Sequence, residues 1–205
     1  MRLVLASASP ARLAVLRAAG IDPVVRVSGV DEHALAAALP GATPAELVTA
    51  LARAKADAVA ADVATEHPDA VVVGCDSMLH VGGELAGKPG CASTALRYWQ
   101  AMAGGTGELL TGHAVVRLDG GAVTATASGA QTTLIRFSTP SAAEIVAYVG
   151  TGEPLQVAGG FTLDGRGGWF VDGIDGDPSS VIGISLPLTR RLLAGVGVPV
   201  VSLWT

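Results

Sequence analysis

The sequence is poor in the residues that mark several common classes of protein. Only 15% of its 205 residues are charged and 4% are aromatic, and the net charge of −5 comes without a basic stripe. Nucleic-acid-binding surfaces are rich in lysine and arginine, so we expect no nucleic-acid partner. No apolar run approaches the roughly 20 residues that a membrane-spanning helix requires, and no secretory leader is evident. The sequence therefore predicts a cytoplasmic protein with no membrane partner.

Cysteine and lysine are also scarce. The two cysteines, Cys75 and Cys91, do not show the spacing of a metal site, and Cys75 falls in an apolar run that predicts a core position. Lys55 and Lys88 are the only lysines among 13 basic residues. An anionic substrate would therefore be held by a few local cations or by a metal ion.

Small apolar residues dominate what is present. Half of the chain is apolar and 27 residues are glycine, which supports a single domain of residues 1–205, compact or two-lobed. The periodicity predicts strands at 2–6, 23–27, 71–75, 108–118, 123–137, 161–163, 169–174 and 198–204. It predicts helices at 10–20, 43–61, 93–102, 141–150 and 187–193. Alternating strands and helices followed by a strand-rich part predict an α/β fold with a mixed sheet.

The stretch from Val71 to Gly90 is the first candidate for a functional site. Its three consecutive valines predict a buried strand, and Asp76 follows where that strand is expected to end. Gly74 is small enough for another group to approach the backbone. An acid placed by a strand and Lys88 placed by a turn could hold a metal ion and a phosphate between them. A turn-capping aspartate and a solvated lysine are an equally good interpretation.

Residues 82–88 match the first seven positions of a phosphate-binding P-loop. The eighth position should carry a serine or threonine hydroxyl for magnesium, but it is Pro89, which also lacks an N–H group. A P-loop helix should begin at the lysine, and the proline and glycine that follow disfavour one. We therefore set the P-loop interpretation aside.

The turn before the first expected helix offers donors to an anion. Ser7, Ser9 and Pro10 connect a strand to a helix N-terminus, where free N–H groups and the positive end of the helix dipole point to one spot. Arg12 adds a further donor there. Capping of the helix by Ser9 alone is the alternative.

An acidic pair and the other lysine are further candidates. Asp31 and Glu32 fall at an expected strand end or loop, where paired acids are usually solvated. A capping box at 43–46 begins a helix that is expected to reach about residue 61. Lys55 borders the apolar stripe of that helix, so its ammonium either extends to water or reaches a buried anion.

These segments together resemble the Maf family, also called septum-formation inhibitor proteins, and the resemblance covers nearly the whole chain. Each motif is short, but their order and spacing are specific, and the set is most similar to actinobacterial members. The motifs are Leu-Ala-Ser-Ala-Ser-Pro at 5–10, Val-Asp-Glu at 30–32, Ala-Arg-Ala-Lys at 52–55, Gly-Cys-Asp-Ser at 74–77, Gly-Lys-Pro at 87–89, Thr-Gly-His at 111–113, Gly-Glu-Pro at 152–154, Ala-Gly-Gly-Phe at 158–161 and Val-Ile-Gly-Ile-Ser-Leu-Pro-Leu at 181–188.

The resemblance implies a two-lobed, inosine-triphosphatase-like α/β fold with a mixed sheet and an active cleft between the lobes. It implies hydrolysis of nucleoside triphosphates, with modified or non-standard ones among them, to a monophosphate and pyrophosphate with Mg²⁺ or Mn²⁺. A homodimer is a further expectation. By motif, the implied catalytic residues are Asp76, Glu32, Lys55 and Lys88, with the metal at Asp76 and Glu32. The implied substrate-binding residues are Ser7, Ser9, Arg12, Ser77 and His113.

The chain departs from the family in two places. Ala11 stands where the family usually has the first arginine of Ser-Pro-Arg-Arg. Val157, Phe161 and Asp164 stand in the region that marks the branch selective for dTTP and UTP, and this region is closer to the branch that resembles 7-methyl-GTP pyrophosphatases. The rival hypothesis is a nucleotide-binding regulator of cell division or septum formation with little or no catalysis. It predicts nucleotide binding without a monophosphate product.

Overall fold

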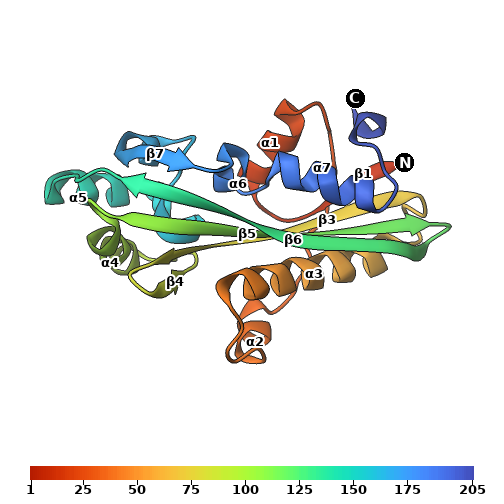
Figure 1. Ribbon diagram of the computed structural model, residues 1–205, viewed down its shortest axis with the longest axis horizontal. Helices are drawn as coiled ribbons and strands as arrows, with labels where there is room; N and C mark the ends of the chain where they lie inside the picture. Colours follow the sequence, from red (N-terminus) through yellow and green to blue (C-terminus); the bar gives the residue numbers. More distant parts are fainter. The chain divides into compact units, whose positions relative to one another are not determined.

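The chain forms a mixed α/β structure, which confirms the predicted fold class. The structure is a computed structural model that describes residues 1–205. Its sheet has seven strands in the order β2-β1-β3-β5-β6-β7, with β4 paired to β3. The strands are β1 (Arg2–Ala6), β2 (Val24–Val25), β3 (Ala70–Val81), β4 (Glu84–Ala86), β5 (Thr106–Asp119), β6 (Ala122–Phe137) and β7 (Val171–Asp175) (Figure 1). No helix combines the length and the hydrophobicity that a membrane span requires.

The residues divide into two compact units. Unit 1 contains Met1–Asp76, Thr111–Gln131 and Gly183–Thr205, and unit 2 contains Ser77–Leu110 and Thr132–Ile182. The long strands β3, β5 and β6 contribute residues to both units.

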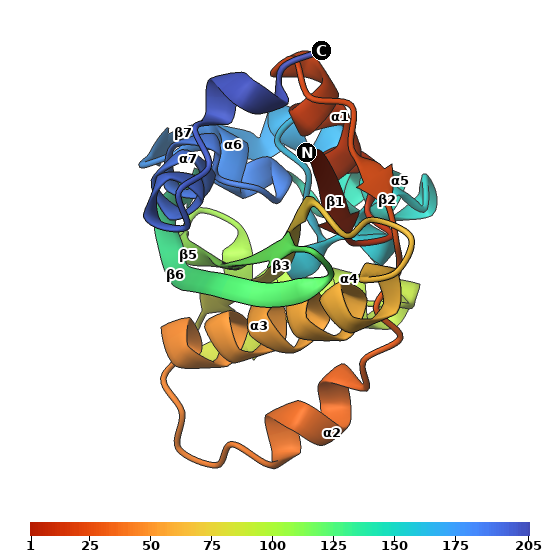
Figure 2. The same cartoon turned by 90° about the vertical axis from the view of Figure 1, so that its right-hand side faces the viewer.

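Unit 1 has helices on both faces of its strands (Figure 2). β1 pairs in parallel with both β2 and β3. Leu3 and Leu5 pack with residues of α1 (Pro10–Ala18) and α7 (Leu186–Gly195). Val4 and Ala6, which point to the opposite face, pack with α3 (Pro44–Val63). Because strands covered on both faces have no polar side, they appear in the sequence as continuous apolar runs.

Helix α3 lies unusually close to the strands because two glycines face it. A Cβ atom on Gly74 would lie 2.4 Å from the carbonyl oxygen of Ala52, and one on Gly112 would lie 2.1 Å from that of Val48. The expectation that Gly74 permits a close approach is therefore confirmed. The capping box of α3 is also confirmed, since Thr43 and Glu46 bond each other's backbone N–H groups.

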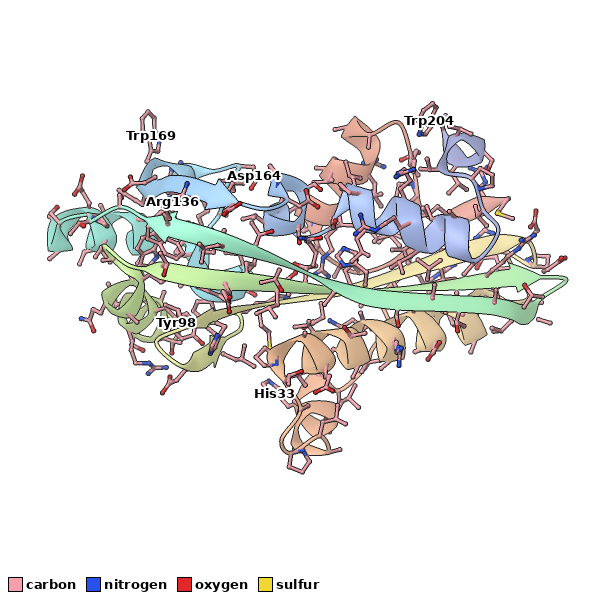
Figure 3. All side chains as sticks on the ribbon, viewed as in Figure 1. His33, Tyr98, Arg136, Asp164, Trp169 and Trp204 are labelled. Carbon is pink, nitrogen blue, oxygen red and sulfur yellow. The ribbon has the colours of Figure 1, made fainter.

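Unit 2 concentrates most of the few aromatic residues in one cluster. Trp99, on α4 (Ala92–Met102), makes edge-on contacts with Phe137, Tyr148 and Phe170, and its indole N–H donates to the carbonyl of Gly160 at 3.0 Å. The remaining elements are α5 (Ala142–Gly150), the 3₁₀ helices η1 (Glu153–Gln156), η2 (Ala158–Gly160) and η3 (Arg166–Phe170), and α6 (Pro178–Ile182). Trp169 projects away from η3 and is 86% exposed (Figure 3).

The P-loop interpretation is excluded by the turn between β3 and β4. Gly82 and Gly83 both have positive φ and connect paired strands in which Val81 lies opposite Glu84. Two consecutive residues with positive φ are typical of a tight hairpin turn. Residues 82–88 therefore belong to a hairpin and the coil after it, and no helix begins at Lys88.

Three of the strands expected from the sequence differ in the structure. The strand expected at 198–204 is the 3₁₀ helix η4 (Val200–Leu203), because Pro199 supplies no N–H and Ser202 bonds back to its carbonyl. The strand expected at 161–163 is irregular, and Thr162 is instead bonded to Glu153. The strand expected at 23–27 is reduced to the two residues of β2.

Two corrections concern candidate site residues. Asp76 lies within β3 and not at its end, since β3 continues to Val81 and pairs there with β4. Of Asp31 and Glu32, only Asp31 lies outside regular structure, and Glu32 belongs to a helix. Asp31 caps helix α2 (Glu32–Ala37) by accepting from the Ala34 N–H at 2.9 Å, and Glu32 begins that helix.

Candidate active site

Asp76 is a buried carboxylate with one oxygen available. The residue is 5% exposed, and its Oδ1 accepts from the Lys55 ammonium at 2.6 Å. Its Oδ2 is also buried but has no hydrogen-bond partner. Buried polar atoms are nearly always satisfied, so an unpaired carboxylate oxygen indicates a position where a ligand can bind.

Lys55 bridges two carboxylates. Its Nζ lies 2.6 Å from Asp76 Oδ1 and 2.7 Å from Glu32 Oε1. The Lys55 side chain is 9% exposed and the Glu32 side chain is 49% exposed, so the group runs from the core to the surface. The sequence left open whether the Lys55 ammonium extends to water or reaches a buried anion. The structure confirms the contact with a buried anion.

The close approach of α3 to β3 positions this ion pair. Gly74 contacts the turn of α3 that contains Ala52 and Ala56, and Lys55 lies on that same turn. Asp76 follows two residues later on the same strand and therefore points to the same face as Gly74. A larger residue at 74 would move α3 outward and take the ammonium away from the carboxylate.

Glu32 is placed by a peripheral helix. Helix α2 contains no buried residue and lies on the far side of α3 from the strands (Figure 2). His33, its second residue, is exposed (Figure 3). The contact with Lys55 therefore ties this small helix to the buried group.

Ser7, Ser9 and Arg12 form a hydrogen-bonded turn in the same unit. Ser7 Oγ accepts from the Ser9 N–H and from Arg12 Nη1, both at 3.1 Å. Ser9 caps α1 by accepting from the Arg12 N–H at 3.4 Å, as the alternative interpretation predicted. The Arg12 guanidinium also donates to the carbonyls of Cys75 and Gly183, each at 2.8 Å. Arg12 thus connects the turn by hydrogen bonds to Cys75, the residue that precedes Asp76.

His113 lies on β5 and is completely buried. Its Nε2 accepts from the Ser185 N–H at 2.8 Å, and its Nδ1 lies 3.0 Å from the Thr111 carbonyl oxygen. These contacts place the ring in the core and not at a surface that a substrate reaches directly.

Lys88 and Ser77 belong to unit 2. Lys88 is exposed in the coil between β4 and α4. Two backbone hydrogen bonds hold this coil, from Gly90 to the Leu155 carbonyl and from Gly159 to the Gly87 carbonyl. The phosphate contacts of Lys88 and Ser77 stay predictions.

The sequence did not single out Gly183, Ser185 or Glu153 as candidate site residues. They appeared only as members of the family motifs. Ser185 caps α7 by accepting from the Leu188 N–H, and the pair Ser185 and Pro187 is a helix-start signal that the sequence displayed. Glu153 accepts from the Thr162 hydroxyl at 2.6 Å and from the Gly167 N–H at 3.2 Å. The contacts of Glu153 follow no local pattern, because its partners lie 9 and 14 positions further along the chain.

The electrostatics of the group follow from its burial. Burial raises the pKa of Asp76, and the nearby Glu32 carboxylate raises it further, while Lys55 and Arg12 oppose the shift. Burial also raises the pKa of the neighbouring Cys75 thiol to about 11, so this cysteine is an inert core residue. The surroundings of Asp76 therefore tune its ionisation.

The two carboxylates fit a divalent cation of the magnesium type. No cluster of three or more His, Cys, Asp or Glu side chains forms a complete metal site. Mg²⁺ is typically bound by one or two carboxylates and takes its other ligands from phosphates and water. The unpaired Oδ2 of Asp76 and the partly exposed Glu32 offer such a set.

Comparison with known proteins confirms the resemblance. The model of the family described as "Maf-like protein" matches residues 2–196. A protein of Saccharopolyspora erythraea is 68% identical over 205 residues, covering 100% of this chain and 97% of its own. One from Nocardia farcinica is 64% identical, covering 98% and 96%, and one from Mycolicibacterium gilvum is 56% identical, covering 100% and 99%. All three are named nucleoside triphosphate pyrophosphatase. The chain therefore belongs to the Maf-like protein family.

Proposed function

We infer that the protein is an enzyme that hydrolyses nucleoside triphosphates to the monophosphate and pyrophosphate, the activity for which its relatives are named. The observation that best supports a site in unit 1 is the buried Asp76, with Oδ1 on Lys55 and Oδ2 unpaired. A carboxylate held in this way can orient a water molecule and accept its proton. We therefore propose Asp76 as the general base or as a metal ligand.

The cations around Asp76 suit a negatively charged substrate. Water must approach a phosphorus atom that is shielded by anionic oxygens, and negative charge builds up as the anhydride bond between the α and β phosphates breaks. Lys55 and Arg12 hold positive charge beside the carboxylate and are fixed in place by hydrogen bonds before substrate binds. Preorganised charge of this kind stabilises the transition state.

We propose that Asp76 and Glu32 hold a divalent cation, Mg²⁺ or Mn²⁺. Such an ion neutralises phosphate oxygens and can activate water when it is bound. In its absence, Lys55 lies between the two carboxylates and offsets their repulsion. Lys55 can then turn from Glu32 to a phosphate oxygen while it keeps its bond to Asp76.

The remaining contacts are proposed from the family motifs. Lys88 and Ser77 would contact the phosphates, and the turn of Ser7 and Ser9 would offer N–H groups. We propose that modified or non-standard triphosphates are among the substrates, that the enzyme works in the cytoplasm, and that it forms a homodimer.

A substrate panel tests this function. Standard and modified triphosphates are incubated with Mg²⁺ or Mn²⁺, and pyrophosphate release is measured. We expect metal-dependent release for at least one triphosphate and none after chelation of the metal. Nucleotide binding by calorimetry with no release from any member of the panel would contradict the proposal and favour the regulator hypothesis.

A further inference from the structure

The hydrogen bonds of His113 fix the form of its ring. Because the backbone N–H of Ser185 can only donate, Nε2 of His113 must accept at 2.8 Å and therefore carries no proton. Nδ1 lies 3.0 Å from the Thr111 carbonyl oxygen, which can only accept, so Nδ1 carries the proton. The ring is thus a neutral imidazole with one defined tautomer.

The segment that His113 holds leads directly to Arg12. Two residues before Ser185, the carbonyl of Gly183 accepts from Arg12 Nε at 2.8 Å. Arg12 Nη1 then donates to the Cys75 carbonyl at 2.8 Å, next to Asp76. A continuous series of contacts therefore connects the buried ring to the backbone that carries the carboxylate.

Gly183 and Arg12 pack closely, so a side chain at position 183 would have little room. Gly183 has φ of +134°, and a Cβ atom there would lie 3.2 Å from Arg12 Cγ and 3.3 Å from its Nε. The carbonyl of Gly183 meets the guanidinium only while residues 183–185 keep their place. Ser185, two residues after Gly183, is held by the hydrogen bond from its N–H to His113 Nε2.

We propose that His113 is a positioning residue for hydrolysis and makes no contact with the substrate. Its neutral Nε2 holds Ser185, which places the Gly183 carbonyl against Arg12, and Arg12 in turn sets the strand at Cys75 and its own charge beside Asp76. This inference rests on the proposed function. It differs from the motif-based expectation that His113 binds substrate.

Substitution at His113 tests the proposal. His113→Gln keeps an acceptor oxygen for the Ser185 N–H, whereas His113→Leu removes it. Loss of a residue that orients catalytic groups typically costs ~10–100-fold in activity, so we expect such a fall in kcat for His113→Leu, with KM changed much less. His113→Gln is expected to recover most of the lost rate. Thr189→Val is the control, since Thr189 is buried on α7, the helix that Ser185 caps, and its hydroxyl has no partner.

Two NMR measurements distinguish a positioning role of His113 from a contribution to stability alone. The Arg12 Nε–H signal is expected to shift in His113→Leu and to keep its wild-type position in His113→Gln and Thr189→Val. The ¹⁵N spectrum of wild-type His113 is expected to show the Nδ1-protonated tautomer, and this measurement decides the case even if His113→Leu does not fold. An Nε2-protonated ring, or a His113→Leu variant with wild-type kcat, would overturn the inference. A wild type without turnover would instead refute the proposed function.

Discussion

The surroundings of Asp76, the residue proposed as general base or metal ligand, oppose its ionisation. Burial favours the neutral carboxyl, while Lys55 and Arg12 favour the carboxylate, and burial dominates, so the pKa is raised. A raised pKa means that the folded protein keeps the proton to a higher pH than the unfolded chain. The contribution of Asp76 to the free energy of unfolding is therefore present below its unfolded pKa and is lost as pH rises through its folded pKa.

The titration of Asp76 in the metal-free protein gives the first prediction. ¹³C NMR should place the pKa of its carboxyl above the usual range for aspartate. Lys55→Met should raise this pKa further, because it removes the ammonium 2.6 Å from Oδ1. Arg53→Met is the matched control, since Arg53 lies on the same helix but bonds Ser128. An unchanged titration in Lys55→Met would contradict the assigned ion pair.

The two cysteines should react very differently with iodoacetamide. Cys91 is exposed, and hydrogen bonds with the Ser93 and Thr94 hydroxyls lower the pKa of its thiol to about 7. Cys75 is buried, with a pKa of about 11. Mass spectrometry of the native protein should therefore show one adduct, at Cys91, whose rate of formation has a midpoint near pH 7. Modification of Cys75 at the same rate would contradict its placement in the core.

At the scale of single residues, the sequence could identify candidate site residues but not their partners. Asp76 and Lys55 were predictable because an acid after a valine run and a lysine beside an apolar stripe are unusual. The bonds of Arg12 were not predictable, because its partner Gly183 is 171 positions away. His113 shows the same limit, since its ring bonds a residue 72 positions away.

At the scale of elements, the packing of α3 on β3 determines the geometry of the site. Gly74→Ala would place a methyl group 2.4 Å from the Ala52 carbonyl oxygen. Forcing an extra methyl group into a packed core typically costs about 1–3 kcal/mol, so we expect a lower free energy of unfolding in urea and reduced activity. The control is Gly150→Ala, where the added carbon meets nothing within 4 Å. Equal stabilities of the two variants would contradict the close approach.

The elements that the sequence predicted best are those with local signals. The capping box at 43–46, which begins α3, depends on residues within a few positions of each other. The segment η4 was mistaken for a strand because two of its apolar residues, Val200 and Leu203, pack against the core without a strand partner. Helix α2 was missed because it has no buried face and hence no apolar periodicity.

At the scale of the whole molecule, the boundary between the two units falls within β3. Asp76 is the last residue of the first segment of unit 1, and Ser77 is the first residue of unit 2. The family was predictable because many short motifs keep their order along the chain. The preferred nucleotide base was not predictable, because Val157, Phe161 and Asp164 match neither branch of the family fully. The active cleft between the lobes that the resemblance implies stays a prediction.

Product analysis by ³¹P NMR shows directly which phosphate bond is cleaved and whether cleavage requires Asp76. A triphosphate substrate with Mg²⁺ is followed in parallel with the wild type and with Asp76→Asn, whose fold is checked by circular dichroism. We expect equal amounts of monophosphate and pyrophosphate from the wild type. For Asp76→Asn we expect a rate lower by ~10²–10⁴-fold, the usual contribution of a general base. Orthophosphate and a nucleoside diphosphate as products would contradict the proposed reaction. Near-normal turnover by the folded variant would contradict the proposed role of Asp76.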